Sequence, residues 1–318
     1  MSIDFEDLKG KIRGPTVVVS TPFNDSYELN IEALKENIRF IVDGGIGNGK
    51  GHIVCPCGAG EYTNLSPEEN KMMVEAAVEV AGNKVLVGAG VASCNYREAI
   101  KLALNAAEAG AKYVMIPPPY YYAIGQEDIY RWYKLIAEET KIGIMAYNQP
   151  WRGAYMGTDI SAPLMGKLAT IESMVAFKWN AKTLSDYITT LSLYSKRFSF
   201  IDNTGRYSTA VAHMHGGAGY ITQAGAFWPE FELKYWSLLE QRKYEEALKW
   251  NAKLSPYFEF LTGDGAEGAF GDSSGVKAGL DYVGLHGGPV RPPFIGLTKE
   301  QKKKLFGVLE GIGVPKKR

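Results

Sequence analysis

The feature that most constrains the fold of this chain is a short apolar run that recurs along its first two thirds, followed each time by an amphipathic helical stretch. The apolar runs are continuous rather than alternating with polar residues, which is typical of parallel strands covered on both faces. Eight runs fit this description: Pro15–Ser20, His52–Pro56, Lys84–Val87, Lys112–Ile116, Ile142–Ala146, Ser173–Phe177, Phe198–Asp202 and Gly219–Thr222.

Helical patterns such as Ile31–Val42 and Tyr96–Ala109 separate these runs, and glycines such as Gly44 and Gly110 follow them as helix stops. Eight strand–helix units predict an α/β fold, a (β/α)₈ TIM barrel, which typically takes ~250 residues. An open, doubly wound parallel sheet is the alternative, but it would normally use fewer strands.

The pattern becomes purely helical after about residue 225. A proline-rich connector, Gly287–Ile295, interrupts this part because its prolines are incompatible with a helix. We therefore expect the barrel at residues 1–228 and a C-terminal helical appendage at residues 229–318. The helices expected in the appendage are Phe231–Leu239, Tyr244–Phe260, Ser274–Tyr282 and Lys299–Leu309.

Charge and hydropathy argue against several classes of partner. The chain has 35 basic and 35 acidic residues, so it offers no field for nucleic acid or an anionic membrane. No apolar run reaches the roughly 18–20 residues of a membrane span, and the first residues lack the apolar centre of a signal peptide. Three cysteines, Cys55, Cys57 and Cys94, cannot all pair, so we expect a reducing cytoplasm.

Two glycine-rich segments resemble nucleotide-binding motifs but lack the required context. The segment from Gly44 has Gly51 where a phosphate loop needs Ser or Thr, and its helix precedes the strand. The Gly263–Gly268 spacing matches a dinucleotide fingerprint, yet no predicted strand precedes it. The four histidines are scattered, and Cys55-Pro56-Cys57 lacks the spacing of a zinc knuckle, so no metal site is predicted.

The sixth apolar run ends at Lys178, which lies between Phe177 and Trp179 in the sequence. An ammonium group held among apolar side chains loses hydration, so its neutral amine becomes accessible near pH 7. A neutral amine attacks carbonyl carbon, which is the first step of Schiff-base chemistry. The alternative is a lysine at the solvated end of a strand, with its stem lying on the two rings.

In a (β/α)₈ barrel the chemistry takes place at the C-terminal ends of the strands. Here those ends supply an amine, phenols, an arginine and glycine-rich turns whose backbone N–H groups could hold a carboxylate. This combination suits a 2-oxo acid as the small-molecule partner. The residues concerned are Cys57–Glu61, Gly88–Gly90, Tyr120–Tyr122, Tyr147–Arg152, Lys178 and Ala218–Thr222, within which Gly219 and Ile221 are candidate substrate contacts.

Over nearly its whole length, the chain resembles the dihydrodipicolinate synthase / N-acetylneuraminate lyase family of class I, Schiff-base-forming lyases. The resemblance begins at the Thr21-Pro22-Phe23 turn, continues through the strand ends above, and reaches Val276–Leu280 and Gly287–Pro293. It implies a (β/α)₈ lyase that needs no cofactor, because the imine serves as the electron sink. It also implies a homo-oligomer, a tetramer or a dimer.

The resemblance assigns roles to individual residues. It implies that Lys178 forms the imine and that the Tyr147 phenol moves protons to and from it. Tyr121 would complete a proton relay, often across a subunit interface in this family. Backbone groups at Gly58 and Ala59 would bind the substrate carboxylate, and Arg152 would hold the far end of the substrate.

The chain departs from the family where the Gly-Thr-Thr-Gly-Glu turn is expected. Here the turn reads Cys57-Gly58-Ala59-Gly60-Glu61, so both hydroxyl positions are lost. The hydroxyl that links the two tyrosines is absent at Ala59, which argues against a relay of the synthase type unless water replaces it. The Trp179-Asn180 pair after the lysine is also unlike the synthases.

We therefore expect an aldolase or dehydratase that acts on a 2-keto-3-deoxy sugar acid through an imine on Lys178. One alternative is the synthase reaction itself, the condensation of pyruvate with aspartate semialdehyde, which Arg152 favours. A second alternative, from another class, is a barrel that binds a 2-oxo acid without catalysis. An intact Lys178 and Tyr147 pair argues against that class.

Overall fold

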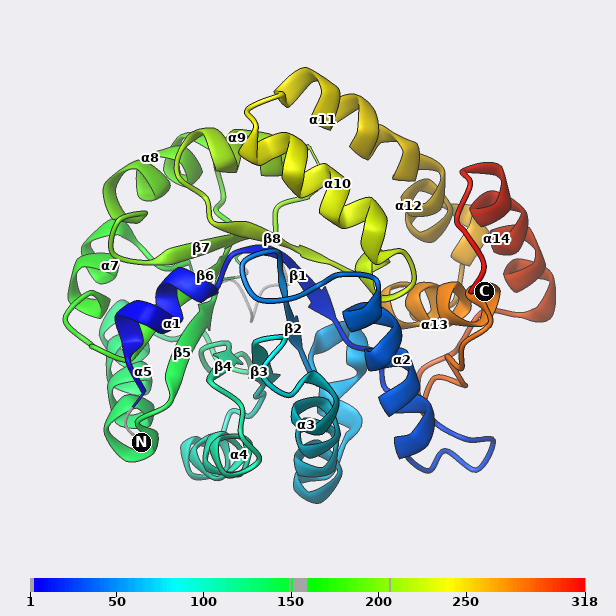
Figure 1. Ribbon diagram of the computed structural model, residues 1–318. Helices are drawn as coiled ribbons and strands as arrows, with labels where there is room; N and C mark the ends of the chain where they lie inside the picture. The colour runs from blue at the N-terminus through cyan, green and yellow to red at the C-terminus, as the bar shows by residue number, and fades with distance from the viewer. Residues whose placement is uncertain (1–2, 149, 151–158, 206, 318) are drawn as a thin grey trace.

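The computed structural model describes residues 3–148, 150, 159–205 and 207–317, which form a closed barrel of eight parallel strands (Figure 1). Each strand pairs with the next in sequence, and β1 pairs with β8 to close the barrel. The predicted (β/α)₈ barrel is confirmed, and the open sheet is ruled out. The strands are β1 Gly14–Val18, β2 His52–Val54, β3 Val87–Gly90, β4 Tyr113–Ile116, β5 Gly143–Tyr147, β6 Met174–Trp179, β7 Ser199–Asp202 and β8 Gly219–Thr222.

Helices surround the barrel and follow the strands in the order expected. Those of the barrel are α2 Ile31–Asp43, α3 Pro67–Ala81, α4 Tyr96–Glu108, α5 Gln126–Thr140, α7 Ala162–Leu168, α8 Leu184–Tyr194, α9 Ser208–Met214 and α10 Pro229–Glu240. Those that follow are α11 Tyr244–Asn251, α12 Ser255–Thr262, α13 Gly271–Val283 and α14 Lys299–Gly311. The expected helix at Tyr244–Phe260 is thus divided into two, and a 3₁₀ turn, Ala252–Leu254, separates them.

An additional helix, α1 (Phe5–Lys11), lies across the N-terminal mouth of the barrel (Figure 1). Its Leu8 belongs to the cluster of apolar side chains inside the barrel, together with Val54 and Met145. The Ser199 hydroxyl at the start of β7 donates to the Lys9 carbonyl oxygen at 2.8 Å. Because α1 closes this end, the open end is the C-terminal one, where the strand-end residues lie.

Most strands differ from the sequence-based prediction by one to three residues at one end or both. Strand β3 lies three residues later than the predicted Lys84–Val87, and the Tyr113 ring fills the space beside its Gly88. A Cβ at Gly88 would lie 2.2 Å from that ring, so only glycine fits there. Strands β5 and β6 continue as far as Tyr147 and Trp179, which places Tyr147 within its strand rather than after it.

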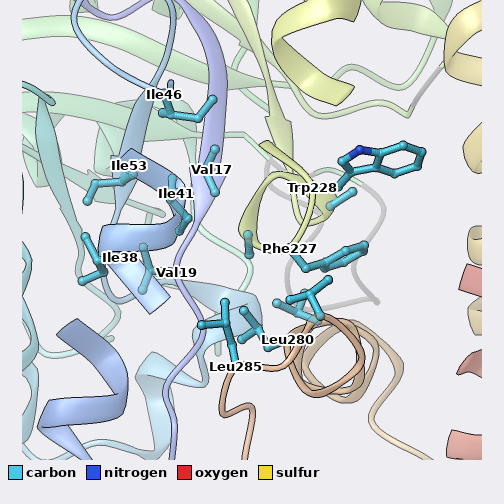
Figure 2. Packing of buried hydrophobic residues seen from close by; sticks show 14 of the residues in the cluster. Val17, Val19, Ile38, Ile41, Ile46, Ile53, Phe227, Trp228, Leu280 and Leu285 are labelled. Carbon is cyan, nitrogen blue, oxygen red and sulfur yellow. The ribbon is translucent and has the colours of Figure 1, made fainter. Parts of the chain in front are cut away.

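The C-terminal helices share a hydrophobic core with the barrel (Figure 2). Val17 of β1 and Val19, which directly follows this strand, belong to the same cluster as Phe227, Leu280 and Leu285. Helix α10 lies where the eighth barrel helix belongs, with its Tyr235 packed against Tyr220 of β8. The division at residue 228 into two folding units stays a prediction. Within the part of the chain described, no helix has the length and hydropathy to cross a membrane.

Candidate active site

Lys178 projects into the barrel near its C-terminal end. The residue is only 7% exposed. Its neighbour two residues back, Ala176, belongs to the cluster inside the barrel, whereas Phe177 and Trp179 pack outside among the helices. Neighbouring side chains on a strand point to opposite faces, so the two rings cannot enclose the amine. The expected flanking of the amine by Phe177 and Trp179 is wrong.

Tyr147 provides the aromatic environment instead. It is paired with Lys178 in the register of β5 and β6, and the Lys178 Nζ lies 3.9 Å from the centre of its ring. Such a contact attracts a cation to the ring face. The two residues that the sequence singled out for imine formation and proton transfer are thus in direct contact.

Two buried asparagines, to which the sequence analysis gave no role, connect the strand ends around Lys178. The Asn148 Nδ2 donates to the Asn180 carbonyl oxygen at 2.7 Å and to Asp159 at 2.8 Å. The Asn180 Nδ2 donates in turn to the Asn203 carbonyl oxygen at 3.3 Å. These bonds tie the ends of β5, β6 and β7 together. The sequence signal that could have pointed to these asparagines is a polar residue directly after an apolar strand.

The Gly58–Gly60 turn follows β2 as a single 3₁₀ turn. Gly58 is exposed, and a Cβ built on it would meet nothing within 4 Å. Ala59 is buried, and its carbonyl oxygen accepts a hydrogen bond from the Ser273 hydroxyl of α13 at 2.8 Å. The turn therefore has free space beside Gly58, whereas Ala59 is held by its hydrogen bond from Ser273.

The groups that act on the pKa of Cys57 indicate which sign of charge this turn favours. Burial raises the pKa of the Cys57 thiol to about 11, although Lys178 and the backbone N–H groups of Gly60 and Ala59 act in the opposite direction. The ammonium and the two N–H groups thus favour negative charge beside the turn. The same groups can stabilise a substrate carboxylate.

The two candidate contacts on β8 differ in their surroundings. Ile221 is half-buried and packs against the cluster inside the barrel. Gly219 lies where β1 comes close, since a Cβ there would be 2.1 Å from the Gly14 carbonyl oxygen. Close packing against β1 is therefore enough to explain a glycine at position 219, and the role of Gly219 in substrate binding stays a prediction.

Of the remaining candidates, Tyr121 is exposed and Arg152 lies outside the described residues. Tyr121 is 67% exposed, and its ring meets that of Tyr122 edge-on at 4.9 Å. Arg152 lies outside the described residues, so its role stays a prediction. Among the residues described, no group of three or more His, Cys, Asp or Glu side chains is arranged to hold a metal ion.

A closed parallel barrel with a buried lysine at the C-terminal end of β6, in contact with a tyrosine from β5, defines a TIM-barrel enzyme of the class I aldolase type. Residues 11–311 match the model of the dihydrodipicolinate synthetase family. The chain belongs to this family and is one of its Schiff-base lyases.

The relatives at about 30% identity carry two kinds of name. The 4-hydroxy-tetrahydrodipicolinate synthase of Prosthecochloris aestuarii is 30% identical over 308 residues, which cover 95% of this chain and 98% of the relative. An uncharacterized DapA-like lyase of Thermococcus onnurineus is also 30% identical, over 95% of this chain and 99% of the relative. The fold also matches that of YagE, a prophage protein of E. coli K12 solved with pyruvate. That match has a TM-score of 0.83 and 20% identity, over 95% of this chain and 99% of the other.

Proposed function

We propose that the protein cleaves or dehydrates a 2-keto-3-deoxy sugar acid through an imine on Lys178. The observation that carries this proposal is the Lys178 Nζ buried within the barrel, 3.9 Å from the centre of the Tyr147 ring. The family supplies the imine chemistry, and pyruvate bound to a protein of the same fold supports a 2-oxo acid as the ligand.

The chemistry follows from the properties of an imine. The Lys178 amine attacks the C2 carbonyl carbon, and loss of water leaves a protonated imine that withdraws electrons from C3. Either the C3–C4 bond then breaks, which releases an aldehyde, or a C3 proton and a C4 hydroxyl leave as water. In this proposal, Tyr147 moves the proton in either case. The ring face beneath the nitrogen also favours the positive charge of the imine.

The choice of substrate class depends on the turn after β2. Gly58 and Ala59 bring no hydroxyl to the site, so a relay that joins two tyrosines through such a group lacks its link. The hydroxyl groups of a sugar acid, or a water held beside them, can take its place. The synthase reaction remains the second candidate because a synthase is 30% identical over 95% of the chain.

Borohydride trapping tests the proposal directly. The protein should be incubated with pyruvate and borohydride, digested, and analysed by peptide mass spectrometry. We expect the reduced adduct on the peptide that contains Lys178, and no adduct in the Lys178→Met variant. Lys182→Met is a suitable control because this lysine lies in the turn that follows the strand. An adduct confined to another lysine, or none with any 2-oxo acid, would refute the assignment.

Turnover separates the lyase from a barrel that only binds its ligand. A protein that traps pyruvate on Lys178 but converts no keto-deoxy acid and condenses no aldehyde would be a sensor. A cytoplasmic location, a homo-oligomeric state and the role of Tyr121 across an interface stay predictions alongside this proposal.

A further inference from the structure

We propose that Lys277 of α13 is a positioning residue for the active site: through Glu61 it holds the Gly58–Gly60 turn in the shape that receives the substrate carboxylate. The inference rests on the proposed function and deepens it. It makes recognition of the carboxylate depend on a helix of the C-terminal region rather than on the barrel alone.

Lys277 and Glu61 form a buried ion pair. The Lys277 Nζ lies 2.6 Å from the Glu61 Oε1, with side-chain exposures of 3% and 0%. Lys277 also donates to the Pro289 carbonyl oxygen and lies over the Phe23 ring, 4.6 Å from its centre. The other carboxylate oxygen of Glu61 accepts from the Arg291 backbone N–H at 3.0 Å. Both oxygens of the carboxylate are therefore held by the C-terminal region.

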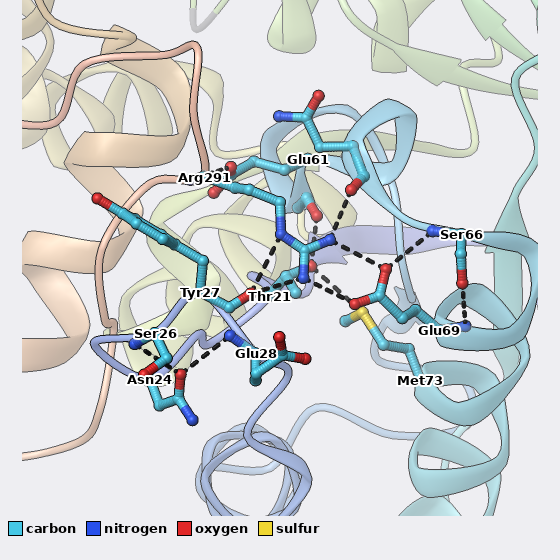
Figure 3. A network of polar contacts seen from close by, with 12 residues as sticks. Thr21, Asn24, Ser26, Tyr27, Glu28, Glu61, Ser66, Glu69, Met73 and Arg291 are labelled. Atoms are coloured by element: carbon cyan, nitrogen blue, oxygen red, sulfur yellow. Dashed lines mark hydrogen bonds and ion pairs between the residues drawn. The ribbon is translucent and has the colours of Figure 1, made fainter.

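Arg291 extends this attachment to both sides of the turn (Figure 3). Its guanidinium forms a two-pronged pair with the Glu69 carboxylate, at 2.7 and 2.9 Å, and donates to the Tyr27 carbonyl oxygen at 2.7 Å. It also donates to the Asn64 carbonyl oxygen at 2.7 Å. The chain segments on either side of the turn are thus tied to the same connector, Gly287–Ile295.

The turn needs such support because its backbone is not in a favoured conformation. Glu61 has φ 58° and ψ 30°, in the left-handed region that residues with side chains rarely adopt. Gly60 lies so close to β1 that a Cβ would be 2.4 Å from the Val19 carbonyl oxygen. External contacts, rather than local preference, therefore define the shape of the turn.

One face of α13 reaches the turn at two points. Ser273 holds the Ala59 carbonyl oxygen at 2.8 Å, and Lys277, one helical turn later, holds Glu61. A shift of this helix face would displace the turn, and with it the Gly58 and Ala59 N–H groups that are expected to receive the carboxylate. The Ala59 N–H group is also one of those that favour negative charge at Cys57. Loss of Lys277 should therefore weaken carboxylate binding more than imine formation as such.

Because the Lys277–Glu61 pair is buried, its loss should change the shape of the turn. Burial lowers the pKa of Lys277, while Glu61 and Asp281 act to raise it and Arg291 acts to lower it further. Removing the ammonium leaves the Glu61 carboxylate buried without its partner, which favours rearrangement of the turn. A purely structural role would lower stability alone, whereas a positioning role changes which ligands the site accepts.

The test compares two ketones that form the same imine. Pyruvate carries a carboxylate and acetone does not, and both can be trapped on Lys178 with borohydride. In Lys277→Met we expect the pyruvate concentration for half-maximal trapping to rise by about ten- to a hundredfold. Trapping of acetone should stay within about twofold of wild type, because it does not use the turn. Equal losses for both ketones, or none for either, would overturn the inference.

Two further variants make the result decisive. Ser273→Ala removes the second contact without leaving a buried charge, so it serves if Lys277→Met does not fold. We expect it to raise the half-saturating pyruvate by about fivefold, again without effect on acetone; no change would count against the inference. Lys302→Met is the control, because it breaks a more exposed pair, the one with Asp281, and leaves Lys277 and Ser273 in place.

The outcome for the wild-type protein separates this inference from the proposed function. If wild type gives no adduct on Lys178 with pyruvate, the proposed function itself fails. If wild type is trapped and Lys277→Met and Ser273→Ala behave like it toward both ketones, the imine stands and only the positioning role is lost.

Discussion

Lys178 and Tyr147 occupy paired positions on neighbouring parallel strands, with the Lys178 Nζ over the face of the Tyr147 ring at 3.9 Å from its centre. A ring face attracts positive charge. It therefore favours a protonated imine, which carries its charge at the same nitrogen. If the imine forms on Lys178 as proposed, the pairing supports its positive charge, and the hydroxyl of the same ring is the proposed proton carrier.

The first prediction separates these two uses of Tyr147. Tyr147→Phe keeps the ring face and removes only the hydroxyl, so pyruvate should still be trapped on Lys178. The value of kcat for the best substrate should fall by about 10²–10⁴, the usual effect of losing a proton-transfer group. Tyr194→Phe is the control, since the hydroxyl of this α8 tyrosine donates to the Ala162 carbonyl oxygen at 3.1 Å. A kcat close to wild type in Tyr147→Phe would remove the hydroxyl from the mechanism.

The second prediction concerns the turn without hydroxyls. Gly58 has free space beside it, so the double variant Gly58→Ser/Ala59→Ser should fold. We expect it to gain at least about tenfold in the condensation of pyruvate with aspartate semialdehyde, because a hydroxyl restores a link for proton transfer. The measurement is kcat/KM for condensation in both proteins. If the variant folds without any gain, the missing hydroxyls do not limit this reaction.

The third prediction concerns the free energy of unfolding at acidic pH and the buried His52 at the start of β2. Burial lowers the pKa of His52 from 6.5 to about 4, and its ring bonds to the Thr16 hydroxyl at 3.0 Å. The unfolded chain takes up a proton below pH 6.5 whereas the folded chain does not, so stability falls as pH drops from about 6.5 to about 4. The loss should reach about 3 kcal/mol.

Urea unfolding of wild type and His52→Gln across this pH range provides the measurement. Glutamine cannot take up the proton, so the variant should show a shallower dependence on pH, even if it is less stable at pH 7. Parallel curves for the two proteins would show that other groups cause the acid sensitivity.

The main features of this fold were accessible from the sequence because each strand is a continuous apolar run, which only a covered parallel sheet explains. Lys178 and Tyr147 could be placed at strand ends for the same reason. The sequence alone did not show that the Phe177 and Trp179 rings point away from the Lys178 amine. Neighbours in a strand are close in the chain, but their side chains point to opposite faces. The bonds of Asn148 and Asn180 depend on which strands are adjacent, and a single sequence does not show such long-range pairs.

The fourth prediction concerns metal ions. An imine withdraws electrons from the reacting bond, so the reaction needs no Lewis acid. We expect exhaustive chelation, followed by removal of the chelator, to leave kcat unchanged within error. Recovery of a lost activity only when a divalent ion is added back would show that this expectation is wrong.

The last prediction chooses between the two lyase reactions and assigns Arg152. Wild-type protein should be assayed with several C5 and C6 2-keto-3-deoxy acids and, in parallel, with pyruvate and aspartate semialdehyde. We expect turnover of at least one keto-deoxy acid and weak condensation, because the turn at Gly58 and Ala59 lacks the relay hydroxyl. If Arg152 holds the far end of the substrate, Arg152→Ala should raise KM about ten- to a hundredfold while pyruvate is still trapped on Lys178. Efficient condensation without turnover of any keto-deoxy acid would make the synthase reaction the function, and Arg152 would then hold the semialdehyde carboxylate.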